Sequence, residues 1–151
     1  MNVQGIQQQV DKGQIGQYRK NPVKLLKWLE NNLPNNKIIM GTGFGPPGIV
    51  LLDMLLKITN NISVFYIDTG FLFDQTYDLK NKLEKKYGFK FLRFCTELTP
   101  EMQEDKYGAK LWEQDPDACC NIRKVIPLKN ALKNYDVWIT GIRKSQTEMR
   151  Q

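Results

Sequence analysis

The chain has 151 residues, the size of one ordinary domain, with 41% hydrophobic residues, 25% charged residues and a net charge of +6. This composition is typical of a globular protein and excludes a disordered tail. No apolar run approaches the roughly 20 residues that a membrane-spanning helix needs, and the glutamine-rich start does not resemble a secretory signal. We therefore expect a cytoplasmic protein without a membrane partner.

The net charge and the cysteine and histidine content limit the partners and the catalytic groups that this protein can have. The positive surplus favours an anionic partner, but the basic residues are dispersed and form no nucleic-acid footprint, so we expect no nucleic-acid partner. Three cysteines without a secretion signal argue against a disulfide framework. The sequence contains no histidine, which excludes a histidine base or metal ligand within it.

In chain order, a polar lead-in over residues 1–20 precedes one domain over residues 21–151. Asn21 and Pro22 are typical of a helix start, and the apolar residues that follow at spacings of three and four predict an amphipathic helix. A later segment, residues 49–58, is apolar almost all round, which predicts a helix buried against a sheet. The other expected elements are strands at 37–40, 62–67, 89–94 and 137–140, and helices at 74–88 (capped by Asp74 and ended by Gly88), from Thr99 onward, and at 119–132, interrupted near Pro127.

Strands that alternate with helices in units of about 30 residues predict a parallel α/β three-layer sandwich. Ligands of such sheets bind outside the carboxyl ends of the strands. We therefore expect the segments at 41–48, 68–70 and 141–146, each of which follows a strand, to converge at one edge.

The glycine-rich segment satisfies G-x-G-x-x-G from Gly43 to Gly48, and Asp68 follows at the distance of a ribose-binding acid. In a dinucleotide site the backbone N–H groups at the helix start hold the pyrophosphate. Pro46 and Pro47 have no N–H, so the segment favours a phosphate or an adenylate over NAD. An NAD-dependent oxidoreductase and a turn that binds nothing remain the alternatives.

Cys119 and Cys120 are adjacent, and two cations, Arg123 and Lys124, follow within about a turn. Nearby positive charge favours thiolates, and paired thiolates suit soft metals or iron–sulfur clusters. The alternative is two small structural residues on a helix. A [4Fe–4S] cluster takes four thiolates, and Cys95, which we interpret as structural, would still leave the set one short.

From Gly41 to Arg150 the chain resembles the cluster-bearing branch of the adenylyl-sulfate/phosphoadenylyl-sulfate reductase family, which has an adenine-nucleotide α-hydrolase-like fold. The matching segments occur in family order, and the region that they span covers about two thirds of the sequence. They are T-G-F-G at 42–45, V-L-L-D at 50–53, D-T-G-F-L-F at 68–73, Y-G-A-K-L-W-E at 107–113, D-P-D-A-C-C-N-I-R-K-V-I-P-L at 115–128 and W-I-T-G-I-R-K-S-Q at 138–146.

The resemblance implies reduction of adenylyl sulfate, or of its 3′-phosphorylated form, to sulfite and AMP or 3′,5′-ADP, with a thiol donor such as thioredoxin, in sulfate assimilation and cysteine biosynthesis. It implies that Cys119 and Cys120 supply half the ligands of a [4Fe–4S] cluster. Lys124, between cluster and sulfate, and Arg143 would have catalytic roles. The implied substrate-binding residues are Thr42, Gly43, Phe44, Gly45, Asp68, Thr69, Gly70, Lys124, Gly141, Arg143, Gln146 and Arg150.

The sequence also departs from the family pattern. The family continues with a second cysteine pair and a nucleophilic cysteine, neither of which occurs here, so we expect a truncated chain that is inactive alone. Pro47 stands where an acidic residue is common, and Thr147 where serine is usual. The alternative function is an adenylate-binding module without turnover. The choice between the two sulfonucleotides, the electron donor and the oligomeric state, including a homo-oligomer, stay open.

Overall fold

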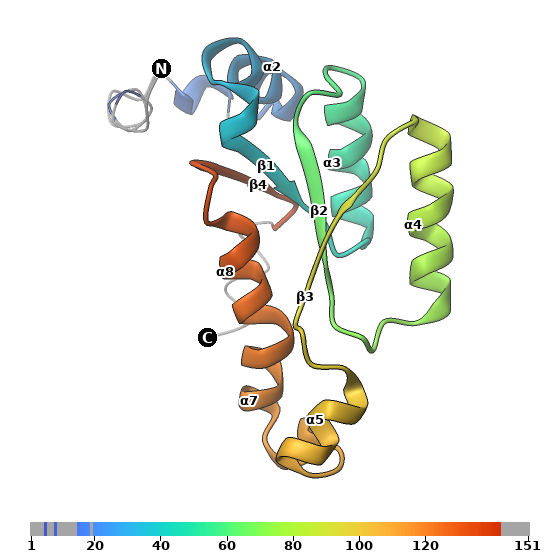
Figure 1. Cartoon of the computed structure of the whole chain (residues 1–151). Helices are drawn as coiled ribbons and strands as arrows, with labels where there is room; N and C mark the ends of the chain where they lie inside the picture. The colour runs from blue at the N-terminus through green and yellow to red at the C-terminus, as the bar shows by residue number, and fades with distance from the viewer. Residues whose placement is uncertain (1–4, 6–7, 9–14, 19, 143–151) are drawn as a thin grey trace.

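The structure, a computed structural model, describes Gly5, Gln8 and residues 15–18 and 20–142. Its centre is a sheet of four parallel strands in the order β3-β2-β1-β4, with helices on both faces (Figure 1). The predicted parallel three-layer sandwich is confirmed. The strands are β1 (Ile38–Gly41), β2 (Ser63–Asp68), β3 (Leu92–Cys95) and β4 (Val137–Thr140).

Helices connect these strands, and no helix among the described residues is long and apolar enough to cross a membrane. The α-helices are α2 (Pro22–Asn32), α3 (Pro46–Leu56), α4 (Asp74–Tyr87), α5 (Pro100–Tyr107), α6 (Leu111–Gln114), α7 (Pro116–Cys120) and α8 (Ile126–Leu132). Shorter helices are η1 (Ile15–Tyr18), η2 (Asn35–Lys37) and a π-helical turn, η3 (Asn121–Val125). This π-turn is the interruption that the sequence predicted near Pro127.

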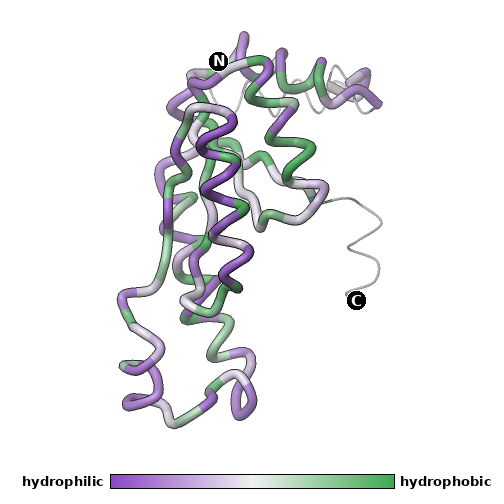
Figure 2. Tube along the Cα trace, turned by 90° about the vertical axis from the view of Figure 1, so that its right-hand side faces the viewer, coloured by the Kyte–Doolittle hydropathy of each residue, from purple (hydrophilic) through white to green (hydrophobic). Residues whose placement is uncertain are grey.

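Two hydrophobic clusters hold the helices on the sheet, because successive strand residues point to opposite faces. Ile38, Met40 and Val64 belong to the larger cluster, which includes buried residues of α2, α3 and α4. Ile39 and Phe65 belong to the smaller cluster, against α8. In Figure 2 the helix facing the viewer, α4, is mostly hydrophilic with hydrophobic residues at intervals, as expected of a helix that buries one side.

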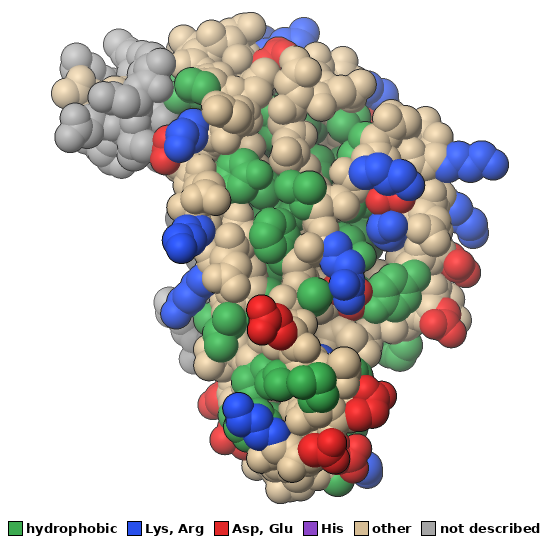
Figure 3. Space-filling view, in the orientation of Figure 1, with side chains coloured by type: hydrophobic (Ala, Val, Ile, Leu, Met, Phe, Trp, Pro, Cys, Tyr) green, Lys and Arg blue, Asp and Glu red, His purple; other side chains and the backbone are tan. Residues whose placement is uncertain are grey.

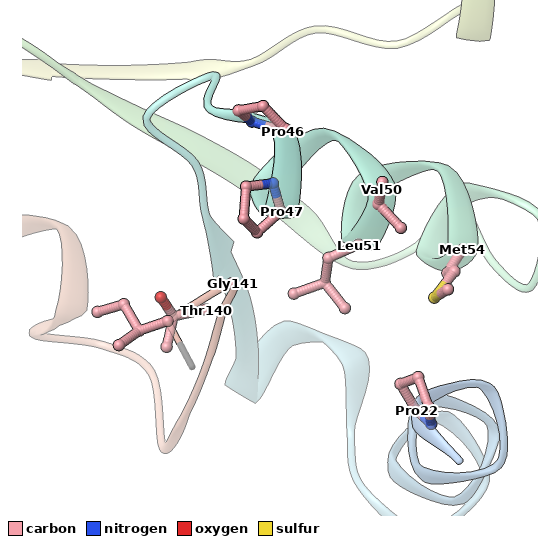
Figure 4. A pocket seen from close by; sticks show the side chains of 9 residues that line it. Pro22, Pro46, Pro47, Val50, Leu51, Met54, Thr140 and Gly141 are labelled. Atoms are coloured by element: carbon pink, nitrogen blue, oxygen red, sulfur yellow. The ribbon is translucent and has the colours of Figure 1, made fainter. Parts of the chain in front are cut away.

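The 49–58 helix packs against the sheet as expected, but it is not buried over its whole surface. Leu52 and Leu55 of α3 are fully buried, but Val50 is 54% exposed. The face of α3 that carries Val50, Leu51 and Met54 lines an open cavity of about 760 Å³ beside the end of β4 (Figure 4). Among the described residues β4 is an edge strand, paired only with β1, so nothing beyond it covers this face of α3.

Two boundaries also differ from prediction. Asp74 is not the cap of α4, because Phe73 takes that position without a side-chain bond and Asp74 begins the helix, where its charge suits the dipole. The third strand begins at Leu92 instead of Phe89. The N–H of Phe91 donates to Glu84 Oε1 at 3.0 Å, which ties this stretch to α4 and not to β2.

The short helices α5, α6 and α7 form a projection beyond the carboxyl ends of β2 and β3 (Figure 1). We call residues 100–120 the acidic lobe, because they carry six carboxylates and only two lysines. Figure 3 shows carboxylates gathered around this end of the molecule and lysines and arginines mainly over the rest. The cysteine pair lies where the acidic lobe meets the more basic body.

Candidate functional site

The glycine-rich loop after β1 is held by its own side chains. Thr42 Oγ1 accepts a hydrogen bond from the N–H of Phe44 at 3.0 Å, and Phe44 has a left-handed φ of 61°. The ring of Phe44 is buried against Tyr66 and Phe91, with centroids 5.5 and 5.1 Å away. Phe44 therefore anchors the loop in the core, and a ligand here would meet backbone instead of this ring.

Gly43 and Gly45 lie open on this loop. Neither has a positive φ, and a Cβ added to either would meet nothing within 4 Å. Folding alone therefore gives no reason for glycine at these positions, whereas close approach of a ligand to the backbone does. Pro46 and Pro47 occupy the start of α3, so Gly48 is the first helical residue with an N–H. This start is poorly equipped to hold a pyrophosphate in the dinucleotide manner.

Gly141, which follows β4, packs directly against the start of α3. A Cβ at Gly141 would lie 3.0 Å from the nitrogen of Gly48 and 3.1 Å from the carbonyl carbon of Pro47, so only glycine fits (Figure 4). The predicted convergence of the first and third loops is thus observed. The other candidate residues of the third segment, Arg143, Gln146 and Arg150, lie outside the described residues.

Asp68, at the end of β2, is only 3% exposed and fully engaged. It accepts hydrogen bonds from Arg93 Nε at 2.7 Å, the Tyr77 hydroxyl at 2.7 Å and the Gly70 N–H at 3.0 Å. Burial alone would raise the pKa of Asp68, but these three donors outweigh it and hold the pKa below its usual value. Burial and the same carboxylate raise the pKa of Tyr77 to about 12. Asp68 therefore fixes the loop that contains Thr69 and Gly70.

The cysteine pair closes one wall of a pocket of about 630 Å³. Cys119 is buried and Cys120 exposed at the end of α7, and exposed Lys124 follows on the π-turn. π-Turns are frequent at functional sites. The pocket is lined by Thr69, Phe71, Leu72, Trp112, Pro116, Cys119, Cys120, Arg123 and Lys124.

Two thiols on one wall can act as a pair of soft-metal ligands. Within the described residues, however, no group of three or more histidine, cysteine, aspartate or glutamate side chains could hold a metal. Cys95 lines a different cavity, of about 300 Å³, with Asp68 and Arg93. The chain's donors thus fit half of a four-thiolate set.

Arg123 belongs to this site although the sequence singled out its neighbour. It is 2% exposed, and its guanidinium donates to the carbonyl oxygens of Thr69 (2.8 Å) and Thr99 (3.0 Å) and to Gln103 Oε1 (2.7 Å). It also stacks 4.6 Å from the centroid of Phe71. Burial holds the pKa of Arg123 below its usual value. Arg123 was visible only as a cation after the cysteines; Gln103 gave no sequence signal.

The structure thus brings the candidate residues into two groups at the carboxyl ends of the strands. Gly141 packs against the helix start that the glycine-rich loop leads into, and Thr69 and Lys124 line the pocket of the cysteine pair.

The parallel sheet, with loops converging at the strand ends, is that of the adenine-nucleotide α-hydrolase-like fold. The family model for the phosphoadenosine phosphosulfate reductase domain matches residues 37–151, and the chain belongs to this family.

Curated relatives agree with this assignment. The chain is 34% identical over 148 residues to an adenosine 5′-phosphosulfate reductase of Halalkalibacterium halodurans, covering 97% of this chain and 64% of the relative. It is 38% identical to the Salinibacter ruber reductase of the same name, covering 85% of this chain and 51% of that protein. The chain spans about half to two thirds of the length of these relatives.

A solved structure supports the fold in the same way. A crystal structure of phosphoadenylyl-sulfate reductase from Candida auris, in complex with phosphate, superposes with a TM-score of 0.78 at 33% identity. The match covers 93% of this chain and 70% of that one. The predicted fold and the reductase family are therefore confirmed, and membership of the cluster-bearing branch stays a prediction.

Proposed function

We propose that this chain binds a sulfonucleotide, adenylyl sulfate or 3′-phosphoadenylyl sulfate, as part of a cytoplasmic reductase of sulfate assimilation. In the overall reaction, two thiols of a donor such as thioredoxin become a disulfide, and the sulfonucleotide gives sulfite and AMP or 3′,5′-ADP. The observation that carries the proposal is the pocket in which Thr69, Arg123 and Lys124 surround the cysteine pair.

The two groups of residues would divide the substrate between them. Gly43, Gly45 and Gly141 would take up the adenylate side, where the open backbone of the loop supports close approach. Lys124, with Arg143 from the third segment, would neutralise the sulfate and the phosphate released from it. Several donors and positive charges suit a mixed anhydride, because negative charge grows on the leaving group as the bond to sulfur breaks.

Cys119 and Cys120 would hold half of a [4Fe–4S] cluster, with the remaining thiolates supplied from outside this sequence, since its third cysteine, Cys95, lies elsewhere. When bound, such a cluster would supply polarisable iron and sulfur atoms near the substrate. Cys95 is poorly suited as nucleophile, because it lines a different cavity from Lys124. This supports a second candidate function, adenylate binding without turnover.

Calorimetry with AMP, adenylyl sulfate, NAD and adenosine at equal concentrations tests the binding proposal. We expect AMP and adenylyl sulfate to bind and NAD to bind much more weakly, because Pro46 and Pro47 remove the N–H groups that a pyrophosphate needs. Lys124→Met should weaken the binding of adenylyl sulfate about tenfold or more, since it removes a charge-assisted contact worth about 1.5–3 kcal/mol. A preference for NAD would contradict the proposal.

A further inference from the structure

Gln103 of α5 has a fully buried side-chain amide that lies between two side chains of the site. Its side chain is 2% exposed, with Arg123 on one side and Cys119 on the other. Its Oε1 accepts from Arg123 Nε at 2.7 Å, and its Nε2 donates to Cys119 Sγ at 3.8 Å. Arg123 lies within the matching segment at 115–128, but the resemblance implied no catalytic, substrate-binding or ligand role for it or for Gln103.

The direction of this hydrogen-bonded chain follows from chemistry. The two ends of a glutamine amide are normally hard to tell apart, but a guanidinium has five donors and no acceptor. The oxygen of Gln103 must therefore face Arg123, which leaves its NH₂ group facing Cys119. The sulfur of Cys119 is consequently the acceptor.

Arg123 is itself fixed at the other end. Its two terminal nitrogens donate to the carbonyl oxygens of Thr69 and Thr99. The loop after β2 and the residue that caps α5 therefore determine where Arg123 lies, and Arg123 determines how Gln103 is turned. Cys120, by contrast, is exposed, so the two adjacent cysteines are in unlike environments.

We propose that Gln103 is a positioning residue for Cys119, and that its N–H···S hydrogen bond, oriented by Arg123, holds this sulfur as an acceptor ready to act as a metal ligand. The proposal rests on the function proposed above, in which Cys119 and Cys120 are ligands. Partners of this kind typically change metal affinity by about 10–100-fold when they are removed.

Gln103→Glu is the decisive variant, because the carboxylate still accepts from Arg123 but cannot donate to Cys119. Gln114→Glu is its matched control: it makes the same charge change in the acidic lobe, and Gln114 donates to the carbonyl of Ala109 and not to a cysteine. The full 151-residue chain is titrated anaerobically with Co²⁺ alone, and thiolate-to-cobalt charge-transfer absorption is recorded. We expect about 10–100-fold weaker binding for Gln103→Glu and parental binding for Gln114→Glu.

A second readout needs no metal. Native alkylation of Cys119 relative to Cys120, measured by mass spectrometry, should fall several-fold in Gln103→Glu, because the thiol must then donate to the carboxylate. Parental cobalt affinity together with a parental alkylation ratio would overturn the proposal and leave Gln103 as a packing residue. If the parent shows no thiolate–cobalt band, the ligand role of the cysteines fails, while the alkylation ratio still decides the role of Gln103.

Circular dichroism checks that each variant is folded. Gln103→Met, uncharged and similar in size, serves as the second variant if Gln103→Glu does not fold. It removes the same donor, so the same loss of cobalt affinity is expected, and parental affinity in Gln103→Met would equally overturn the proposal.

Discussion

Two buried charges at the carboxyl ends of the strands are stabilised in different ways. Asp68 has an ion pair with Arg93 at 2.7 Å and two further donors. Arg123 forms no ion pair among the described residues and instead donates to neutral oxygens. A buried cation without a carboxylate is costly, and its retention beside the cysteine pair fits a site that receives anions.

The bonds of Asp68 predict a pH dependence of stability. Its pKa is held below the ordinary value of about 3.9, so on acidification the unfolded chain takes up a proton first. The stability that Asp68 contributes is therefore fully present above about pH 4 and is lost as the pH falls through the native pKa. Glu84, whose lowered pKa reflects Lys90, Phe91 and Lys80 outweighing burial, acts in the same direction.

Asp68→Asn tests this assignment. We expect it to reduce the free energy of unfolding by about 2 kcal/mol at pH 7, and the difference from the parent to shrink as the pH falls below about 4. Urea denaturation at several pH values measures both. A difference that stayed constant with pH would mean that the ionised form of Asp68 contributes no special stability.

At the scale of helices and strands, the residues that begin and end helices could be predicted from the sequence, but the burial of a helix face by the rest of the fold could not. Asn21 caps α2 through a bond to the Lys24 N–H, and Gly88 ends α4 with a φ of 67°, both as predicted. The exposure of α3 could not be predicted, because it depends on what lies beyond β4. The start of the third strand was also predicted wrongly, because the N–H of Phe91 donates to the side chain of Glu84 on α4 instead of pairing with β2, and strand propensity does not reveal such a side-chain bond.

The candidate site likewise contains residues that the sequence could predict together and one that it could not. Cys119, Cys120 and Lys124 lie in one contiguous motif, so the sequence could place them together. Gln103 comes from another helix, and only the fold brings its amide to the sulfur of Cys119.

Substitution of two glycines by alanine should distinguish a glycine that is needed for folding from one that is needed for nucleotide binding. Gly88→Ala forces a side chain into a left-handed conformation and should cost about 1–2 kcal/mol of unfolding free energy without changing AMP affinity. Gly43→Ala meets no neighbour and no positive φ, so stability should be unchanged while AMP binding weakens. Thermal or urea unfolding and calorimetry on both variants measure this. Unchanged AMP binding in Gly43→Ala would remove the loop from the proposed site.

Charge is unevenly distributed over the whole molecule. The chain carries +6 overall, yet the acidic lobe holds six carboxylates against two lysines, so the remainder is more basic than the total suggests. The described residues outside the acidic lobe, which we call the basic body, include the glycine-rich loop and Gly141, and the cysteine pair ends the lobe where the chain returns to this body. The positive charge of this basic body attracts anions, the six carboxylates of the acidic lobe repel them, and salt screens both effects.

Salt should therefore weaken the binding of anionic nucleotides and not that of neutral ones. Between about 50 and 500 mM NaCl the Debye length falls from roughly 14 to roughly 4 Å, which removes the contribution of charges beyond the immediate contacts. We expect the affinity for AMP to fall at least about threefold over this range, as measured by calorimetry. Adenosine, which lacks the phosphate, is the matched ligand and should bind equally at both salt concentrations. Equal salt dependence for AMP and adenosine would show that the phosphate does not lie in the field of the basic body, and the adenylate would then have to be placed elsewhere on the fold.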